Sequence, residues 1–359
     1  MKKVILLTII VVILSFFTVF SSAEGAADDY ISEFEDVLPE GFDNIASDSS
    51  GVIDMVSARS LYTEFLSIIT DNGGEAIAFF LKLIGSAVLL SVAGLCHEKL
   101  SKYIEAAVGM ICSLLIFDSL GPLFLAVEET LCSVSDFFAA LIPITVGITA
   151  LGGGTTTAAV QATGMYTALS FVGDIGTRAF LTISSFGLAM SLLSSLGHNG
   201  ILSITKGVKE LFNRITGIFT ALLTASFALQ TIISSAADSA AMRAAKYAAS
   251  GLIPIVGSTV AGAISTITAG MSYAKGIVGG GAIAVIIYLA LSPLALLLLY
   301  RLALSLVIIF SDFIGSSGGA KIFSSYRFAL DMTITVYSLS NLVYLFMTVI
   351  FIRIGAMAI

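Results

Sequence analysis

Residues 238–281 begin Asp238-Ser-Ala-Ala-Met-Arg243-Ala-Ala-Lys246-Tyr247 and continue through Gly251-Leu-Ile-Pro254-Ile-Val-Gly257 into a run of glycine, serine, threonine and alanine. Long apolar segments flank this stretch on both sides. A lipid bilayer does not tolerate charged side chains or irregular backbone unless protein or water covers them. We therefore expect the stretch to be buried at a protein interface or to line an aqueous path.

The charged part of this stretch has helical spacing. Arg243, Lys246 and Tyr247 would share one face of a helix, because they are three and four residues apart. An alternative is a helix at the membrane surface whose long cationic side chains reach the lipid headgroups. Both interpretations stay open at the level of the sequence.

The composition predicts a membrane protein. Of the 359 residues, 57% are hydrophobic and 11% are charged, whereas soluble domains carry about 25% charged residues. The mean hydropathy is +1.03, and the apolar runs are continuous, which favours helices over an alternating β-barrel. The expected fold class is all-α, a polytopic helical membrane protein with re-entrant or broken helices.

The N-terminal part divides into two segments. Residues 1–23 have the parts of a signal peptide: Lys2 and Lys3, an apolar region, and Ser21-Ser22-Ala23 as a cleavage site. An uncleaved first span is the alternative, because the apolar region is long. Residues 24–75 hold thirteen acidic residues and one basic residue, Arg59, so the positive-inside rule places this acidic segment outside the cytoplasm.

Residues 76–359 form the multi-span domain. We expect spans at about 76–96, 104–127, 179–196, 215–235 and 333–352. Residues 277–314 contain Pro293 and Arg301, and their composition allows either one crossing or two. The side of the C-terminus is therefore left open.

Residues 137–173 are unusual for a span, because they contain Pro143, Gly147 and the triple glycine Gly152-Gly153-Gly154. Two short, broken spans would fit this composition. A re-entrant hairpin with its tip at the triple glycine fits the flanking charges better, since it returns the chain to the side that it left.

An internal repeat is a further expectation. Leu141-Ile-Pro143-Ile matches Leu252-Ile-Pro254-Ile, within similar patterns at about 97–200 and 208–311. Chance is the alternative in a chain of such low diversity. A repeat with interrupted helices in corresponding positions is typical of transporters. The residues expected to form a pore, a gate or a helix break are Pro143, Gly147, Gly153, Asp238, Arg243, Lys246, Pro254 and Gly257.

Catalytic motifs are absent from the sequence. No phosphate-binding loop, HExxH motif or Ser-His-Asp arrangement can be assembled, and the cysteines Cys96, Cys112 and Cys132 have no metal-site spacing. Asp118 is either a buried polar site or part of a break at the membrane surface. We expect that the chain is not an enzyme and that it binds no cofactor, metal ion or nucleic acid.

The element from Asp238 through Arg243 and Lys246 to Pro254 and Gly257, followed by a Leu-rich span, resembles the stage III sporulation protein AE family of endospore-forming Firmicutes. The order of signal peptide, acidic segment and many spans is also similar. This family would lead one to expect a polar or acidic residue soon after Gly257, and residues 258–270 contain no charged residue, which weakens the argument for a charged pore.

The resemblance implies a place in the mother-cell membrane around the forespore. The partners that it implies are the other stage III A operon proteins, including ring-forming proteins and a secretion-type ATPase, together with the forespore stage II Q protein and membrane lipid. The expected function is a channel or export-gate subunit of this complex. A stand-alone secondary transporter and a non-conducting scaffold are the alternatives, with a membrane enzyme a distant fourth.

Overall fold

The computed structural model describes residue 34, residues 36–39, 58–94, 98–176 and 257–356, and scattered positions between 185 and 247. The signal peptide predicted at 1–23 lies outside the described residues. Helices make up the regular structure of the described part, which contains no strand. They are α4 (Ala58–Gly94), α5 (Glu98–Leu151), α6 (Thr155–Ser170), the π-helical turn η1 (Phe171–Gly176), α9 (Gly257–Phe313) and α10 (Ser317–Ala356). The predicted all-α fold is confirmed.

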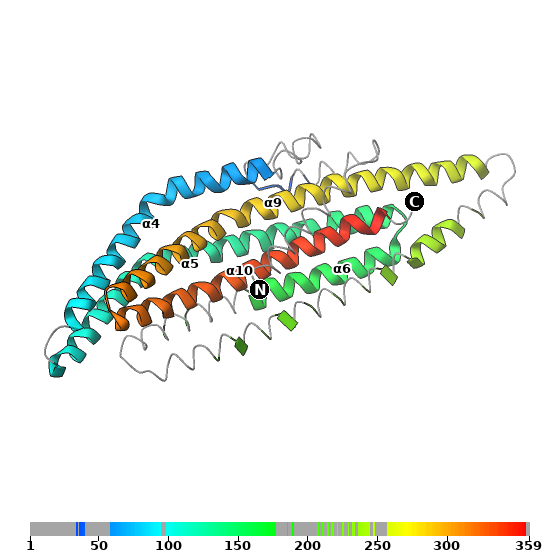
Figure 1. Cartoon of the computed structure of the whole chain (residues 1–359). Helices are drawn as coiled ribbons and strands as arrows, with labels where there is room; N and C mark the ends of the chain where they lie inside the picture. Colours follow the sequence, from blue (N-terminus) through cyan, green and yellow to red (C-terminus); the bar gives the residue numbers. More distant parts are fainter. Residues whose placement is uncertain are drawn as a thin grey trace.

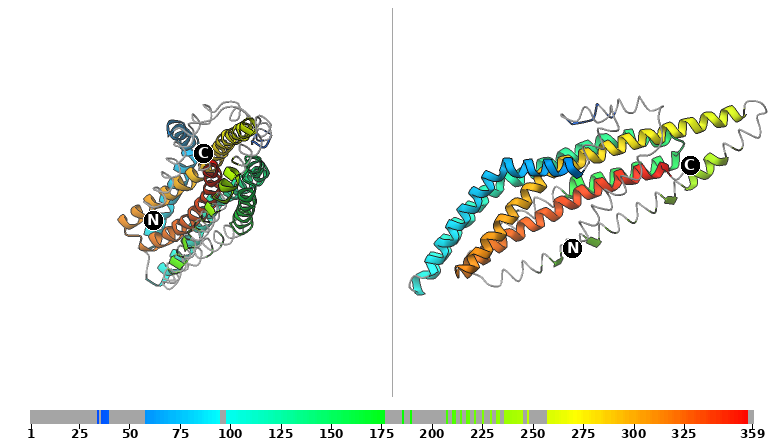
Figure 2. Two further views of the ribbon diagram at one scale, coloured as in Figure 1. Left: turned by 90° about the vertical axis from the view of Figure 1, so that its right-hand side faces the viewer. Right: turned by 45° about the horizontal axis from the view of Figure 1, so that its top comes forward.

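The helices lie side by side along one long axis (Figure 1). α9 and α10 form an antiparallel hairpin, α5 lies alongside it, and α4 and α6 cover opposite flanks. The view down the axis in Figure 2 shows these helices gathered into one bundle. Ser91 Oγ donates a hydrogen bond to the Ile314 carbonyl (3.1 Å), which ties the end of α4 to the α9–α10 turn.

The described residues contain four helices long and apolar enough to cross a membrane. These candidate spans are Ser60–Val92, Ala107–Leu151, Thr268–Phe313 and Gly318–Ile352. α9 continues through Pro293, so residues 277–313 form one helix rather than a hairpin. At 57 residues, α9 is about 85 Å long, nearly three times the thickness of a bilayer's hydrocarbon core.

Two hydrophobic cores follow each other along the bundle. One joins the second half of α5 with α6, the first half of α9 and the end of α10. The other joins α4, the first half of α5, the second half of α9 and the start of α10. Buried tyrosines of α10 anchor both cores, because Tyr344 donates to Ser135 Oγ and Tyr337 to the Ala290 carbonyl, each at 3.1 Å.

The acidic segment contributes to the first of these cores. Phe34 is fully buried there, and Val37, Leu38 and Leu61 pack against the same core. Leu61 belongs to α4, which runs without a break through residue 76, the expected start of the first span. These apolar side chains therefore contact the chain's own bundle.

One expected helix break is wrong. Pro143 lies inside the continuous helix α5, as does Pro122. Proline removes one backbone hydrogen bond from a helix, but a full break in an apolar environment would leave several backbone groups without partners, which costs more. Gly147 likewise continues the helix, and the chain turns only at the triple glycine.

The internal repeat is not confirmed. Pro254 and most of residues 208–256 lie outside the described part of the chain, so the second copy of the pattern cannot be laid over the first. Gly257 is the first residue of α9.

Candidate functional site

The turn between α5 and α6 is built from three glycines. The Gly152 N–H donates to the Ile148 carbonyl (3.0 Å), and the Gly154 N–H donates to the Thr149 carbonyl (3.0 Å), so the glycines complete the last hydrogen bonds of α5. Gly153 has φ of +88°, in the left-handed region that favours glycine. The chain thus forms a tight helical hairpin whose tip is the predicted one.

Asp238 caps the helix that leaves this turn. The Thr156 N–H donates to Asp238 Oδ1 (3.2 Å), and the Thr157 N–H donates to Asp238 Oδ2 (2.6 Å). The local N-cap of α6 is Gly154, which has no side chain to accept these bonds. A carboxylate at this end of a helix also interacts favourably with the helix dipole. A residue far away in the sequence therefore caps α6, a role that usually belongs to a residue next to the helix.

The hydrogen bonds also affect the ionisation of Asp238. Partial burial raises the pKa of its carboxyl group, but hydrogen bonds from Thr157 and Thr156 lower it by more, so the pKa lies below the ordinary value of 3.8. Asp238 is consequently a carboxylate at neutral pH, and its charge holds the segment around it on α6.

Side chains from two further segments cover the glycine turn. A Cβ atom at Gly153 would lie 1.7 Å from Met242 Cε, and one at Gly152 would lie 3.2 Å from Met271 Cβ. Any side chain at Gly153 would displace the Met242 methyl group, and the φ of +88° already disfavours residues other than glycine. The turn, which is the predicted hairpin tip, thus contacts residues 238–242 and the first half of α9.

Lys275 lies one helical turn after Met271 on α9. Its side chain is 6% exposed, and its Nζ lies 5.9 Å from the centroid of the Phe351 ring. The ammonium group interacts electrostatically with Asp238, although within the described part of the chain no ion pair joins them. A buried cation therefore accompanies the carboxylate at the turn.

A ladder of polar side chains runs from the turn into the α5–α6 interface. Thr149 Oγ1 donates to Gln161 Oε1 (2.8 Å), and Thr145 Oγ1 and Gln161 Nε2 both approach the Met165 sulfur, at 3.4 Å and 3.6 Å. All four side chains are buried. Hydrogen bonds of this kind join helices inside membranes, where apolar contact alone is a weak driving force.

The structure brings together only some of the predicted site residues. Gly153 and Asp238 meet at the turn, whereas Pro143 lies on the exposed face of α5. Arg243 is exposed, and its Nε donates to the Ser239 carbonyl (3.2 Å). Lys246 and Pro254 lie outside the described residues.

Sequence reasoning missed several residues. Thr156 and Thr157 act through their backbone, which carries no sequence signal. Arg301 and Asp331 form an ion pair between α9 and α10, within two candidate spans. Their positions at similar distances on either side of Gly315 could have revealed the pair, had the hairpin been known.

The chemistry of the turn is electrostatic. Within the described ranges, no group of three histidine, cysteine, aspartate or glutamate residues could hold a metal ion. What the turn can do is hold a carboxylate on a helix N-terminus. Such a contact can be made or released as a unit.

A family model described as stage III sporulation protein AE matches residues 53–357. No curated protein and no solved structure matches the chain.

Proposed function

Because this chain belongs to the stage III sporulation protein AE family, we propose that it is the membrane channel or export-gate subunit of a sporulation transport complex. The family is a family of sporulation membrane proteins, and the four candidate spans agree with a multi-pass protein.

The contact of Asp238 with the N-terminus of α6 carries the proposal. It joins the two stretches whose composition is least suited to lipid, one around the glycine turn and one around Asp238. Helix termini and charged groups that meet inside a membrane protein are typical of transport sites. We infer that this contact is the closed position of a gate, in which Asp238 and Met242 cover the turn.

The partners belong to the same proposal. The chain would act in the mother-cell membrane around the forespore, with residues 24–75 outside the cytoplasm, beside the ring-forming proteins, the secretion-type ATPase and the forespore stage II Q protein. The lengths of α5 and α9 support a partner, since their apolar spans of 45 and 46 residues far exceed the ~20 that cross a bilayer. The excess needs a protein cover.

Cysteine accessibility in sporulating cells tests the gate. In a background without the three native cysteines, single cysteines would replace Thr155, Thr156, Ser239 and Ala240. Matched controls are Leu125, which is exposed on a candidate span, and the fully buried Ala274. We expect a membrane-impermeant thiol reagent to label sites at the turn but neither control.

Adding Asp238→Asn should raise labelling at positions 155 and 156, because it weakens the contact that closes the turn. If no position were labelled, with or without this substitution, the result would contradict the gate and favour a scaffold. Solute flux by the purified chain alone in liposomes would favour a stand-alone transporter.

A further inference from the structure

The N-terminus of α6 holds a carboxylate through a two-point contact. The Thr156 N–H donates to Asp238 Oδ1 (3.2 Å) and the Thr157 N–H donates to Oδ2 (2.6 Å), so each carboxylate oxygen accepts one backbone hydrogen bond. A helix N-terminus binds anions through such N–H groups and through its dipole. Asp238 comes from a segment 82 residues after Thr156 in the chain, so its carboxylate occupies a place that a carboxylate from another source can also reach.

A buried hydroxyl group at the same place has no hydrogen-bond partner. The Thr157 side chain is fully buried, and its Oγ1 makes no hydrogen bond within the described residues. The hydroxyl lies near enough to the Asp238 carboxylate to help lower its pKa, but the geometry completes no hydrogen bond between them. A buried polar group without a partner costs free energy. This donor therefore indicates an acceptor that Asp238 does not supply.

The surroundings leave room for an anion to approach. A Cβ atom at Gly154 would already touch Asp238 Oδ2, at 3.5 Å, so the glycine at the N-cap keeps the approach to the N–H groups free. The Thr156 side chain is exposed and the Thr157 side chain is buried. The place is thus open to solution on one side and closed at its base. The positive charge of Lys275, which interacts electrostatically with Asp238, also attracts an anion.

Asp238 holds this place only while the gate is closed. When the segment around it leaves the turn, two backbone N–H groups lose their acceptor and the Thr157 hydroxyl still lacks one, which is costly away from water. A carboxylate from solution restores these hydrogen bonds. We propose that the N-terminus of α6 binds a small carboxylate anion that takes the place of Asp238 when the gate opens, an inference that rests on the gate proposed above.

The anion and Asp238 exclude each other, because both bind the same two N–H groups. The anion therefore binds the open state alone, and the population of that state rises with the concentration of the anion. The carboxylate class follows from the geometry of the contact, in which two N–H groups donate to two oxygens of one planar group. Chloride is a single atom and cannot occupy both oxygen positions.

Formate binding to an Asp238→Ala variant tests the site, because formate has the size of the group that this substitution removes. The purified full chain in nanodiscs would be unfolded thermally in sodium formate and in sodium chloride at the same ionic strength, since a ligand of the native state raises Tm in a saturable way. We expect formate to raise the Tm of Asp238→Ala above its value in chloride. In the unchanged chain the same rise should need about tenfold more formate, because the tethered Asp238 has a high effective concentration.

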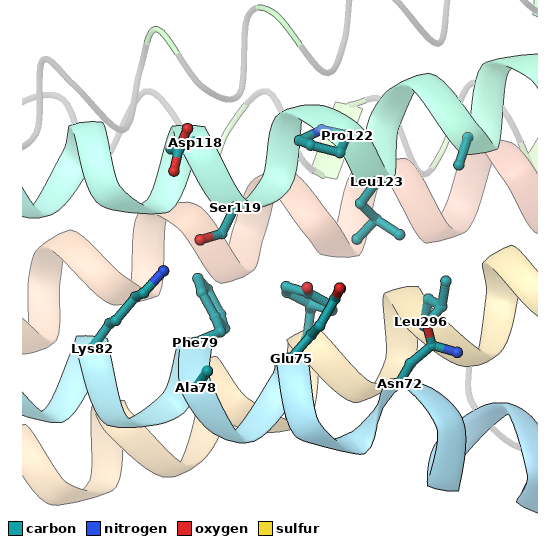
Figure 3. Close-up of a pocket in the computed structure, with 12 residues that line it drawn as sticks. Asn72, Glu75, Ala78, Phe79, Lys82, Asp118, Ser119, Pro122, Leu123 and Leu296 are labelled. Carbon is teal, nitrogen blue, oxygen red and sulfur yellow. The ribbon is translucent and has the colours of Figure 1, made fainter.

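Two further variants separate this site from a general effect of salt. Adding Thr157→Val to Asp238→Ala should raise the apparent Kd for formate about tenfold, because valine keeps the shape of threonine but removes the hydroxyl donor. Asp118→Ala removes an exposed carboxylate of α5 that lies beside a cavity between α4, α5 and α9 (Figure 3), about 50 Å along the helix from the turn. The Tm of this control should respond to formate as the unchanged chain does.

Equal Tm values of Asp238→Ala in formate and chloride, or an unchanged Kd after Thr157→Val, would overturn the proposal. Where Asp238→Ala fails to fold, Asp238→Asn allows the same comparison, because formate should displace its amide more easily than the native carboxylate. Thiol labelling separates this proposal from the gate. In a chain that keeps Asp238, formate should speed the labelling of Ser239→Cys. If formate had no such effect while Asp238→Asn still raised labelling at the turn, the anion site would be refuted and the gate would stand.

Discussion

Asp238 supplies the N-terminal cap of α6, which the residues before α6 lack. A helix N-terminus leaves backbone N–H groups without partners, and a glycine at the N-cap cannot bind them. The carboxylate of a separate segment accepts two of these groups. The stability of α6 and the position of residues 238–242 therefore depend on each other.

Asp238→Ala should lower the free energy of unfolding by about 1 kcal/mol, which is the usual effect of removing an N-cap. Asp238→Asn should cost less, because the amide oxygen can still accept a hydrogen bond. Thermal unfolding of the purified chain would measure both. Asp312→Ala, an exposed carboxylate at the end of α9, is the control, and an equal loss in that variant would contradict the capping role.

The lowered pKa of Asp238 makes this contribution dependent on pH. Stability from a carboxylate with a lowered folded-state pKa is fully present above the pKa of the unfolded chain, about 3.9, and is lost as pH falls through the lower folded-state value. The difference in Tm between the unchanged chain and Asp238→Asn should be constant from about pH 7 to 5 and shrink below about pH 4. A difference that grows on acidification would refute the assigned ionisation.

Gly153→Ala should destabilise the turn for two separable reasons. Its φ of +88° is unfavourable for alanine, and the new Cβ would lie 1.7 Å from Met242 Cε. Backbone strain of this kind costs on the order of 1–2 kcal/mol. The double variant Gly153→Ala with Met242→Ala should regain the stability lost to the steric contact. It should still lack the stability lost to backbone strain. Gly121→Ala, inside α5 and with no atom within 4 Å of the new Cβ, should lose no stability and should gain about 0.5–1 kcal/mol from helix propensity in the same unfolding measurement.

At the scale of elements, the long helices persist through three prolines. Pro122 and Pro143 lie inside α5, and Pro293 lies inside α9. Apolar surroundings favour an unbroken backbone ladder over the local preference of proline. The glycine turn ends a helix because Gly153 reverses the backbone locally and Asp238 caps the helix that follows.

The Arg301–Asp331 pair fixes the register of the α9–α10 hairpin. Both side chains are partly buried, at 29% and 20% exposed, so removing one leaves a charge among apolar helices. Arg301→Met alone should destabilise by about 1–3 kcal/mol, and Asp331→Leu added to it should recover most of the loss. Protein level and spore yield in sporulating cells would report both. A double variant that is worse than the single one would contradict this coupling.

At the scale of the whole molecule, the sequence predicts the fold class better than it predicts the contacts between distant segments. Continuous apolar runs predict the helical fold, and the triple glycine predicts the hairpin tip, because both signals are local. The capping of α6 by Asp238, the burial of Phe34 and the partnership of Arg301 with Asp331 depend on which segments become neighbours. The helix break expected at Pro143 does not form, because the apolar surroundings favour an unbroken helix over the local preference of proline.

The arrangement of the bundle also predicts its orientation. The α9–α10 turn lies beside the end of α4, and the basic residues Lys99, Lys102, Lys321 and Arg327 lie near this end in the chain. The end of α10 lies at the opposite end of the bundle, near the glycine turn (Figure 1). The positive-inside rule then places the α9–α10 turn in the cytoplasm and the C-terminus outside it.

Labelling from one side of the membrane would check this orientation. In the background without native cysteines, a cysteine in place of Gly318, which is exposed at the start of α10, should resist an impermeant reagent added to intact cells. A protease-sensitive tag at the C-terminus should be removed from intact cells, because α10 carries it across the membrane once. Protection of both positions, or access to both, would mean that α10 does not cross, and the hairpin would then need a different place relative to the bilayer.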